Sequence, residues 1–361
     1  MKIVIKIGSS SLTNDAGEIR PEVFAAIASD ITELRRIGHE VVLVSSGAVA
    51  AGMGALSCAS RPAEVGALQA LAAVGQPLLM QQWANAFAHS GNTVGQVLVS
   101  AADFRHRKQY LHARETLSRL LAFGVVPLVN ENDTIASDEL RYGDNDRIAA
   151  LVAHLVDADL LLLLTDIEGV FTADPRHDAN ASLIEEILAV DDALQVVAGG
   201  AGSDRGSGGM ATKLAAAKIA AWSGVRTVIA KAQPEVILAA VAGGAIGTSI
   251  PARADRLAAR KLWIAFACES SGHVVVDDGA VTALSEGGRS LLPAGILTVV
   301  GTFEEDDAIE VHTTQGSLVA KGIARMSARE LGREVELRSE RGSGSQNSVA
   351  IHRDDMVMLI S

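Results

Sequence analysis

The stretch Leu160-Leu161-Leu162-Leu163-Leu164-Thr165-Asp166 sets five leucines in a row before two polar residues. Five apolar residues without alternation indicate a strand that is buried on both faces, as the strands of parallel sheets are. The run is far too short to span a membrane, and Asp157 and Asp159 closely precede it. We therefore expect a buried strand of a parallel sheet.

On both sides of this stretch, short apolar runs alternate with helical patterns through residues 1–250. The other predicted strands are 3–7, 40–44, 95–99, 125–129 and 227–230. The predicted helices are 21–37, 68–88, 109–122, 145–156 and 212–222, the second of them interrupted near Gly75-Gln76-Pro77. This alternation predicts a three-layer αβα domain with a mainly parallel sheet. Ligands bind such sheets at the carboxyl ends of the strands.

The pattern changes after Pro251, where a polar stretch rich in Ala and Arg begins. Short β runs separated by glycines and acidic turns follow, which predicts a small β-rich domain. These runs are 263–266, 273–276, 296–300, 308–312 and 318–323. We expect a first domain at 1–252, a linker at 253–268 and a second domain at 269–361.

The composition limits the classes of protein that fit. Of the 361 residues, 48% are hydrophobic and 20% are charged, which favours a packed core over disorder. The net charge of −12 disfavours nucleic acid and anionic membranes as partners. Cys58 and Cys268 lie in no metal-binding pattern, as expected of reduced thiols. We find no pattern of a signal peptide or membrane span, so we expect a cytoplasmic protein.

Two strand ends carry glycine and serine in a way that suits an anion. Lys6 lies inside the predicted strand 3–7, and a lysine buried there needs an anionic partner. Gly8 and the serines after it allow backbone N–H groups to approach a phosphate, although an ordinary turn would also explain them. The segment Ser45-Ser46-Gly47 opens a small-residue helix that suits a carboxylate or phosphate, or forms a plain N-cap.

Acidic and amide residues gather after the strand 125–129. Asn130-Glu131-Asn132-Asp133 follows it directly, and Gly143-Asp144-Asn145-Asp146-Arg147 comes ten residues later. Carboxylates can bind an ammonium group, and Asn can donate or accept hydrogen bonds. A solvated loop with an N-cap at Asp144 or Asn145 is the alternative explanation.

The leucine run and a later glycine pair supply the last candidate segments. Thr165 and Asp166 end the run, and Gly208-Gly209-Met210-Ala211-Thr212-Lys213 opens the helix 212–222 with a positive charge. The N-terminus of that helix is again a suitable anion site. The Gly/Ser-rich segment 199–209 lies inside the α/β domain, which favours a mobile active-site loop over a linker.

Together these segments resemble the amino-acid kinase family over essentially the whole chain. The motifs, in the family's order, are K-I-G-S-S, S-S-G-A-V-A-A-G, L-V-N-E-N-D, G-D-N-D, L-L-L-L-T-D-I-E-G-V-F-T-A-D-P-R and G-G-M-A-T-K. Near the C-terminus, S-L-L-P-A-G-I, V-G-x-F and A-K-G-I-A are similar to the PUA domain of the bacterial members that act on glutamate. The departures are small: Ser9 stands where many relatives have Thr, and Ser45 where they often have Thr.

The resemblance implies an αβα amino-acid kinase domain followed by a PUA-like domain. It implies ATP and Mg²⁺ as cofactors, with Mg²⁺ held mainly by the ATP phosphates and by no protein ligand. The reaction implied is phosphorylation of the side-chain carboxylate of L-glutamate to L-glutamyl 5-phosphate, the first step of proline biosynthesis. Since a carboxylate is already ionised at neutral pH, this transfer needs positioning and cations rather than a general base.

The family pattern also assigns roles to residues. It implies that Lys6 and Lys213 are catalytic and that Asp146 holds them in place. The implied glutamate-binding residues are Ser46, Asp133, Asp144 and Asn145. The implied ATP-binding and phosphate-binding residues are Lys6, Gly8, Ser9, Thr165, Asp166, Ser207, Gly208, Gly209, Met210, Ala211, Thr212 and Lys213.

The resemblance further implies proline as a feedback inhibitor, a homo-oligomer (dimer or tetramer) and contact with the next reductase of the pathway. Three alternatives stay open. PUA domains elsewhere bind RNA, but residues 269–361 hold 8 Lys and Arg against 15 Asp and Glu, which disfavours nucleic acid. Another acceptor, such as N-acetylglutamate, fits less well because Asp133 and Asp144 favour a free ammonium group. A purely regulatory binding protein would not need two lysines at a phosphate site.

Overall fold

The computed structural model describes residues 1–14, 18–135, 144–175, 177–188, 190, 209–341 and 348–359; at 101, 105, 144 and 338–341 it describes the backbone alone. The contacts divide the chain into two compact units, Met1–Arg256 and Leu257–Ser361. The predicted linker at 253–268 spans this point of division. Each unit has its own sheet and its own hydrophobic core.

The first unit is built on a seven-stranded sheet with the order β3-β4-β2-β1-β5-β6-β7. Its strands are β1 (Lys2–Ile7), β2 (Glu40–Ser45), β3 (Val94–Val99), β4 (Val126–Glu131), β5 (Leu160–Thr165), β6 (Arg226–Lys231) and β7 (Thr248–Ile250). Neighbouring strands are parallel, except that β7 is antiparallel to β6. The predicted α/β fold with a mainly parallel sheet is therefore confirmed, and β7 is a strand that the prediction missed.

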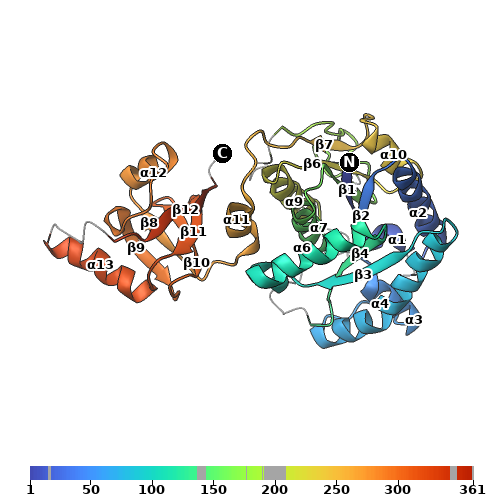
Figure 1. The fold of residues 1–361 in the computed structure, drawn as a ribbon, viewed down its shortest axis with the longest axis horizontal. Coiled ribbons are helices and arrows are strands. Elements are labelled where there is room, and N and C mark those ends of the chain that lie inside the picture. Colours follow the sequence, from blue (N-terminus) through green and yellow to red (C-terminus); the bar gives the residue numbers. More distant parts are fainter. Residues whose placement is uncertain are drawn as a thin grey trace. The chain divides into compact units, whose positions relative to one another are not determined.

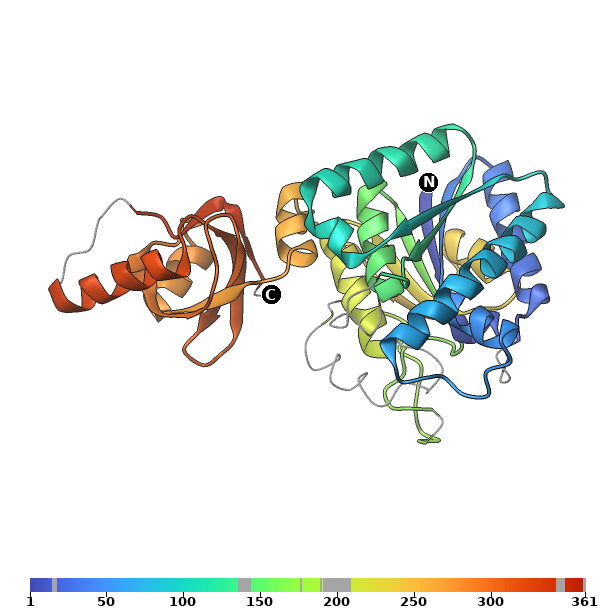
Figure 2. The ribbon, with the colours of Figure 1, turned by 90° about the horizontal axis from the view of Figure 1, so that it is seen from below.

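Helices cover both faces of this sheet (Figures 1 and 2). They are α1 (Ser9–Leu12), α2 (Pro21–Arg36), α3 (Ala48–Ala55), α4 (Val65–Ala88), α5 (Ala101–Arg105), α6 (Arg107–Ala122), α7 (Asp144–Leu155), α9 (Met210–Trp222) and α10 (Val236–Val241). On one face, α7 and α9 contact the central strands β1, β5 and β6. On the other face, α2, α4 and α10 share one core with the isoleucines of β1.

The strand register brings four polar segments to one edge of the sheet. The five leucines of β5 are fully buried, as expected for a strand covered on both faces. Ile7 at the end of β1 pairs with Ser45 of β2 and with Leu164 of β5, and Val129 of β4 pairs with Val44 of β2. The residues that follow these strands therefore leave the sheet at the same edge.

The helix α4 is continuous although Gly75-Gln76-Pro77 lies inside it, so the predicted interruption is wrong. A Cβ on Gly75 would lie 1.8 Å from the carbonyl oxygen of Ala48, and a Cβ on Gly52 would lie 1.9 Å from that of Leu71. The two glycines thus allow α3 and α4 to touch backbone to backbone, and this packing supports the helix across its proline.

The second unit has a five-stranded sheet with the order β12-β11-β10-β8-β9, which confirms the predicted β-rich domain. Its strands are β8 (Gly272–Val276), β9 (Ile296–Gly301), β10 (Ala308–Thr313), β11 (Leu318–Ala324) and β12 (Ile351–Met358). Its helices are α11 (Ala259–Leu262), the π-helix η1 (Trp263–Ala267), α12 (Asp278–Ser285), the short 3₁₀ helix η2 (Pro293–Gly295) and α13 (Ala328–Arg341). The predicted strand at 263–266 is wrong, because a short apolar run looks alike in a buried helix and a strand.

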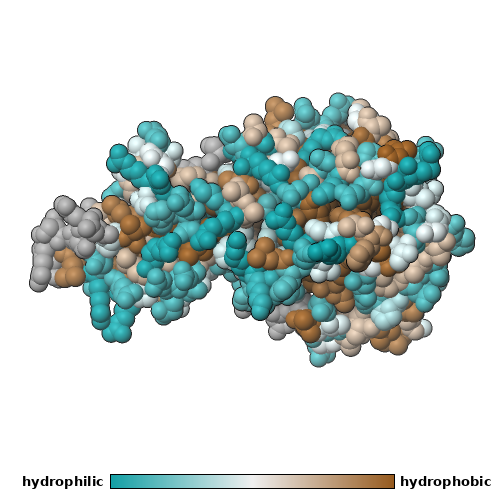
Figure 3. Space-filling view, viewed as in Figure 1, coloured by the Kyte–Doolittle hydropathy of each residue, from teal (hydrophilic) through white to brown (hydrophobic). Residues whose placement is uncertain are grey.

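Hydrophilic residues cover most of the face seen in Figure 3, and apolar residues appear in separate groups. Large hydrophobic side chains that are exposed include Leu56, Leu78 and Phe123 of the first unit. Within the described ranges of the chain, no helix is both long and apolar enough to cross a bilayer.

Candidate active site

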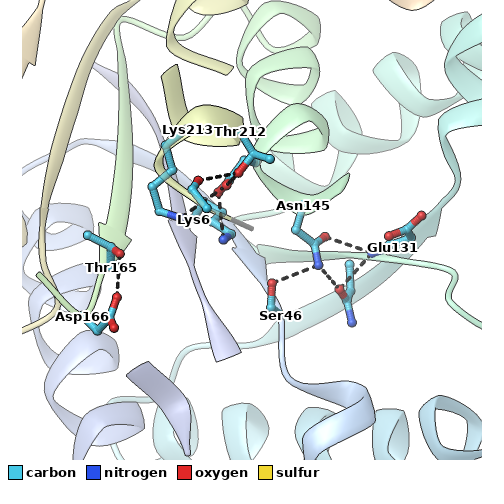
Figure 4. A network of polar contacts seen from close by, with 11 residues as sticks. Lys6, Ser46, Glu131, Asn145, Thr165, Asp166, Thr212 and Lys213 are labelled. Carbon is cyan, nitrogen blue, oxygen red and sulfur yellow. Dashed lines mark hydrogen bonds and ion pairs between the residues drawn. The ribbon is translucent and has the colours of Figure 1, made fainter. Parts of the chain in front are cut away.

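Three charged side chains meet in the interior of the first unit. The Lys6 Nζ lies 2.8 Å from Asp146 Oδ1, and the Lys213 Nζ lies 3.4 Å from Asp146 Oδ2. The three residues are almost fully buried, with exposed fractions of 5%, 1% and 4% for Lys6, Asp146 and Lys213. Figure 4 shows the two lysines converging from separate elements. Buried charges require such pairing, and these three side chains together carry one net positive charge.

The charges shift the pKa values of two members of this cluster. Burial lowers the pKa of Lys6 from its ordinary value, Asp146 raises it, and the like charge of Lys213 lowers it further. Burial disfavours the ionised form of Asp146, but Lys6 and Lys213 outweigh this effect and lower its pKa to about 2. Asp146 is therefore a permanent anion at neutral pH, held between two ammonium groups.

Three elements place this cluster. Lys6 comes from β1, Asp146 from the first turn of α7, and Lys213 from the first turn of α9. Thr212 lies beside Asp146 as well, because its Oγ1 is 2.7 Å from both Asp146 Oδ2 and the Gly209 carbonyl oxygen, and its single hydrogen can be donated to either acceptor. The first turn of α9 thus contacts the first turn of α7 through the carboxylate of Asp146, which also pairs with both lysines.

Two backbone segments beside the lysines can approach an anion closely. A Cβ on Gly8 would lie 3.6 Å from the Lys6 Nζ, in ordinary van der Waals contact, so this backbone runs directly beside the ammonium group. Gly209 is the N-cap of α9, where it makes no side-chain cap, and a Cβ on it would meet no described atom within 4 Å. Met210 and Ala211 continue from it as the first residues of α9, and the N–H groups of this first turn have no acceptors within the helix.

A second network joins the ends of β2 and β4 to the start of α7 (Figure 4). The Asn145 Nδ2 donates to Ser46 Oγ at 3.0 Å and to Asn130 Oδ1 at 2.9 Å. The Glu131 backbone N–H donates to both Asn130 Oδ1 at 2.9 Å and Asn145 Oδ1 at 3.2 Å. The Asn130 Nδ2 in turn donates to Gln76 Oε1 of α4 at 2.7 Å. Amide and hydroxyl groups of this kind suit an amino-acid ligand.

Thr165 and Asp166 form a third polar element at the end of β5. The Thr165 Oγ1 donates to Asp166 Oδ1 at 3.0 Å, and the Thr165 carbonyl oxygen accepts from the Ala232 N–H at 2.8 Å. Asp166 is exposed, whereas Thr165 is buried. Ser9 begins α1 directly after Gly8, at the same edge of the sheet.

The structure brings most of the predicted site residues together and leaves some outside its description. Lys6, Asp146 and Lys213 lie within ion-pair distance, and Ser46 and Asn145 are hydrogen-bonded to each other. Asp133 lies half-buried in the turn after β4. Ser207, Gly208 and the side chain of Asp144 lie outside the described residues.

Sequence reasoning missed two members of the amide network. Asn130 stood in a segment that had been singled out, yet only Asp133 was chosen from that segment. Gln76 carried no signal, because its segment suggested a helix break rather than a functional side chain. Only the fold brings α4 beside the end of β4.

The described side chains also indicate whether the site can bind a metal ion directly. Among the residues that the structure describes, no group of three or more His, Cys, Asp or Glu is arranged to hold a metal ion. Both carboxylate oxygens of Asp146 already face lysines. The chemistry of the described donors fits an anionic, phosphorylated ligand, and a Mg²⁺ that arrives on that ligand's own oxygens is compatible with them.

A parallel α/β sheet with two buried lysines and a helix N-terminus at its carboxyl edge is the arrangement expected of a phosphate-binding α/β protein. The chain belongs to the amino acid kinase family, since residues 1–231 match the family's sequence profile, and residues 272–340 match the PUA domain.

Known proteins from several bacteria are similar to this chain over almost its full length. A protein named "Glutamate 5-kinase" from Paraburkholderia phymatum is 46% identical over 99% of this chain and 98% of its own. One of the same name from Burkholderia thailandensis gives the same identity and coverage. Among solved structures, the UMP kinase from Bacillus anthracis has a TM-score of 0.48 and 16% identity, covering 70% of this chain and 96% of that chain.

Proposed function

We propose that this protein is an ATP-dependent kinase that phosphorylates the side-chain carboxylate of L-glutamate to give L-glutamyl 5-phosphate, the first step of proline biosynthesis. The observation that carries the proposal is the buried Lys6–Asp146–Lys213 cluster, which places two ammonium groups at the carboxyl edge of the sheet. Similarity of 46% over nearly the whole chain to proteins named glutamate 5-kinase supports the choice of acceptor.

The chemistry explains why the site holds two lysines and needs no general base. The acceptor is a carboxylate with an ordinary pKa of about 4.3, so it is ionised at neutral pH. The barrier is the approach of this anion to a triphosphate. Lys6 and Lys213 lower it by placing positive charge around the transferred group, while Asp146 fixes where the two ammonium groups point.

The amide network is our candidate for the glutamate subsite. Ser46 and Asn145 present a hydroxyl and an amide beside the end of β2, and Asp133 follows β4. A carboxylate at Asp133, with Asp144 as a second, suits the ammonium group of a free amino acid. An acetylated acceptor would lack that ammonium group.

The nucleotide subsite in this proposal lies around α9. Its N-terminal turn, from Gly209 through Thr212, faces the phosphates, with Gly8 and Ser9 on the opposite side. Thr165 and Asp166 at the end of β5 border the nucleotide, and Ser207 and Gly208, which precede α9 in the sequence, belong to the same proposed subsite. Mg²⁺, bound mainly through the nucleotide's phosphates, would neutralise charge on the transferred group.

The biology implied by this function includes further partners. We propose a homo-oligomer in the cytoplasm that is inhibited by proline, the end product of the pathway. Contact with the reductase that consumes the labile acyl phosphate belongs to the same proposal.

The first experiment is to measure ADP release by the purified protein with MgATP and five acceptors: L-glutamate, N-acetylglutamate, L-aspartate, carbamate and UMP. Hydroxylamine traps any acyl phosphate as a hydroxamate. We expect glutamate-dependent turnover that yields a hydroxamate. Turnover with a different acceptor and none with glutamate would overturn the acceptor assignment while leaving the lysine chemistry in place.

A further inference from the structure

One hydrogen bond of the amide network comes from outside the strand ends. Gln76 lies on α4, and its Oε1 accepts from the Asn130 Nδ2 at 2.7 Å. Asn130 is 3% exposed, so its amide group has almost no access to water. A buried N–H group without an acceptor costs a large part of its hydration energy. Gln76 therefore supplies an acceptor that Asn130 needs.

This bond is one of three that together fix which way the Asn130 amide faces. The Asn130 Oδ1 accepts twice, from the Asn145 Nδ2 and from the Glu131 N–H. If the amide turned over, its NH₂ group would face these two donors, and its oxygen would face the oxygen of Gln76. With Gln76 in place, only one orientation pairs donors with acceptors throughout.

The orientation of the Asn130 amide determines the hydrogen bonds of Asn145 and Ser46, the two residues that contact the acceptor in our proposal. Asn145 uses both hydrogens of its Nδ2, one on Asn130 and one on Ser46. Because the Ser46 Oγ accepts from Asn145, its own hydrogen can be directed to a third group. A carboxylate of the acceptor is a suitable partner for that hydrogen. The chain of bonds thus runs from α4 through Asn130 and Asn145 to the hydroxyl of Ser46.

The neighbours of Gln76 explain how a side chain of α4 reaches this network. Gly75 removes the side chain that would collide with Ala48, so α4 packs directly on the start of α3, two residues after Ser46. Seven residues along the same helix, the Trp83 Nε1 donates to the Ser45 Oγ at 2.9 Å. One face of α4 therefore holds the polar ends of both β2 and β4.

We propose that Gln76 is a positioning residue for the phosphoryl acceptor, acting through Asn130 and Asn145 on the orientation of Ser46. The inference rests on the proposed function, because it takes the amide network as the acceptor subsite. Gln76 acts on the acceptor side, because its hydrogen bond goes to Asn130, whereas Thr212 and the two lysines contact Asp146.

The test compares four proteins: the wild type, Gln76→Met, Gln76→Glu and Gln81→Met. Methionine matches glutamine in length but cannot accept the hydrogen bond, whereas glutamate keeps an oxygen at the same place. Gln81 lies on the same helix, is exposed, and donates a hydrogen bond to Asn85 at 3.3 Å, so it controls for the substitution itself. The kcat, the KM for glutamate and the KM for ATP are measured for each, with the Tm as a check on folding.

We expect Gln76→Met to raise the KM for glutamate at least about tenfold, as for loss of one buried hydrogen bond, with the KM for ATP unchanged. Gln76→Glu should return the KM for glutamate to within about threefold of the wild type, and Gln81→Met should match the wild type. Unchanged glutamate KM in Gln76→Met, or equal changes in both KM values with no rescue by Gln76→Glu, would overturn the inference.

The proposed function has a separate readout in the same experiment. Wild-type turnover with glutamate tests the acceptor assignment, and the ratio of Gln76→Met to wild type tests the positioning role. If the wild type uses another acceptor of the panel, the four proteins are compared on that acceptor. A folded wild type that turns over no acceptor would overturn both.

Discussion

Asp146 binds Lys6 and Lys213 at the same time, so one buried carboxylate faces two buried ammonium groups. Like charges at close range disfavour each other, and burial disfavours the charged form of a lysine. Both effects lower the pKa of Lys6 and oppose the attraction of Asp146. At the scale of the residue, the two buried ammonium groups therefore lower the free energy of unfolding. In return they provide positive charge that attracts an incoming triphosphate.

This trade predicts opposite effects on stability and activity when Lys6 is replaced. Lys6→Met removes one of two repelling charges, so we expect the Tm to stay equal or rise. It also removes a cation from the transferred phosphate, so kcat should fall at least about 100-fold. Thermal unfolding and steady-state kinetics on the same preparation check both parts.

Two variants serve as controls for this prediction. Lys2 lies on the same strand but is exposed, and its Nζ is 3.9 Å from Glu40, so Lys2→Met should change neither quantity much. Asp146→Asn leaves both lysines buried without their anion and should lower the free energy of unfolding by about 3–5 kcal/mol. A Lys6→Met protein with near-normal kcat would remove Lys6 from the mechanism.

Lys6 stands out in the sequence as a lysine in an apolar strand and Lys213 as a lysine after glycines, whereas the place of Asp146 between them was implied by the family pattern alone. Gln76 and Asn130 could not be chosen in that way. Their role depends on the hydrogen bonds between the amide groups of Gln76, Asn130 and Asn145. These bonds follow only from the packing of α4 on the strand ends.

At the scale of the element, the contact between α3 and α4 rests on two glycines, and Gly75 has the tighter approach. Gly75→Ala would place a Cβ 1.8 Å from the Ala48 carbonyl oxygen and 2.4 Å from the Gly52 nitrogen. We expect a loss of about 3 kcal/mol in the free energy of unfolding, because backbone must move to make room. Chemical denaturation measures this loss.

The matched control lies on the same helix. A Cβ on Gly66 would have its nearest neighbour, the Glu64 Oε1, at 3.7 Å. Gly66→Ala should therefore keep or slightly raise stability, since alanine favours helix over glycine. If both variants unfold at the denaturant concentration of the wild type, the packing argument for Gly75 is incorrect.

The junction between α2 and α10 predicts a pH dependence. Asp30 of α2 is buried, and burial raises its pKa to about 6, although the N–H groups of Ile237 and Glu235 at the start of α10 partly oppose this. A raised pKa means that the fold prefers the protonated carboxyl. Its contribution to stability is therefore fully present below about pH 4, the ordinary range of an aspartate, and is lost as pH rises through about 6.

Asp30→Asn isolates this contribution, because asparagine keeps an acceptor oxygen but does not titrate. We expect the Tm of Asp30→Asn minus that of the wild type to be more positive at pH 7.5 than at pH 4.5. Thermal unfolding of both proteins at the two pH values measures this difference. The same difference at both values would show that Asp30 has an ordinary pKa in the folded protein.

The long, periodic elements were predictable from the sequence, and the exceptions have physical causes. The buried strands and the helices on them follow from uniform apolar runs and amphipathic stripes. A short apolar run such as Trp263–Ala267 gives no period to decide between helix and strand. The break expected in α4 failed because tertiary packing outweighs the local preference of Gly and Pro.

At the scale of the whole molecule, the polypeptide that leaves the first unit is fastened to it before the second unit begins. The Arg253 guanidinium lies 4.1 Å from the centre of the Trp222 ring, and the Arg253 N–H donates to the Ala221 carbonyl oxygen at 3.0 Å. Arg256 forms an ion pair with Asp157 at the end of α7. Both contacts lie at the ends of α7 and α9 opposite to the ends that carry Asp146 and Lys213.

This arrangement predicts different behaviour for two shortened chains. Every described candidate residue lies in the first unit, so a chain of residues 1–256 should fold and keep its glutamate-dependent turnover. A chain of residues 1–250 lacks the two arginines and should have a lower Tm, because it loses a cation–π contact and an ion pair worth about 1–2 kcal/mol together. Equal Tm values for the two chains would contradict the fastening role.

The position of β1 in the sheet has a consequence during synthesis. β1 lies between β2 and β5, yet β5 begins at Leu160, so one edge of the first strand has no partner until more than a third of the chain exists. At bacterial elongation rates this takes on the order of 10–30 s. Throughout that time the nascent chain exposes an apolar, hydrogen-bonding edge that can join other chains.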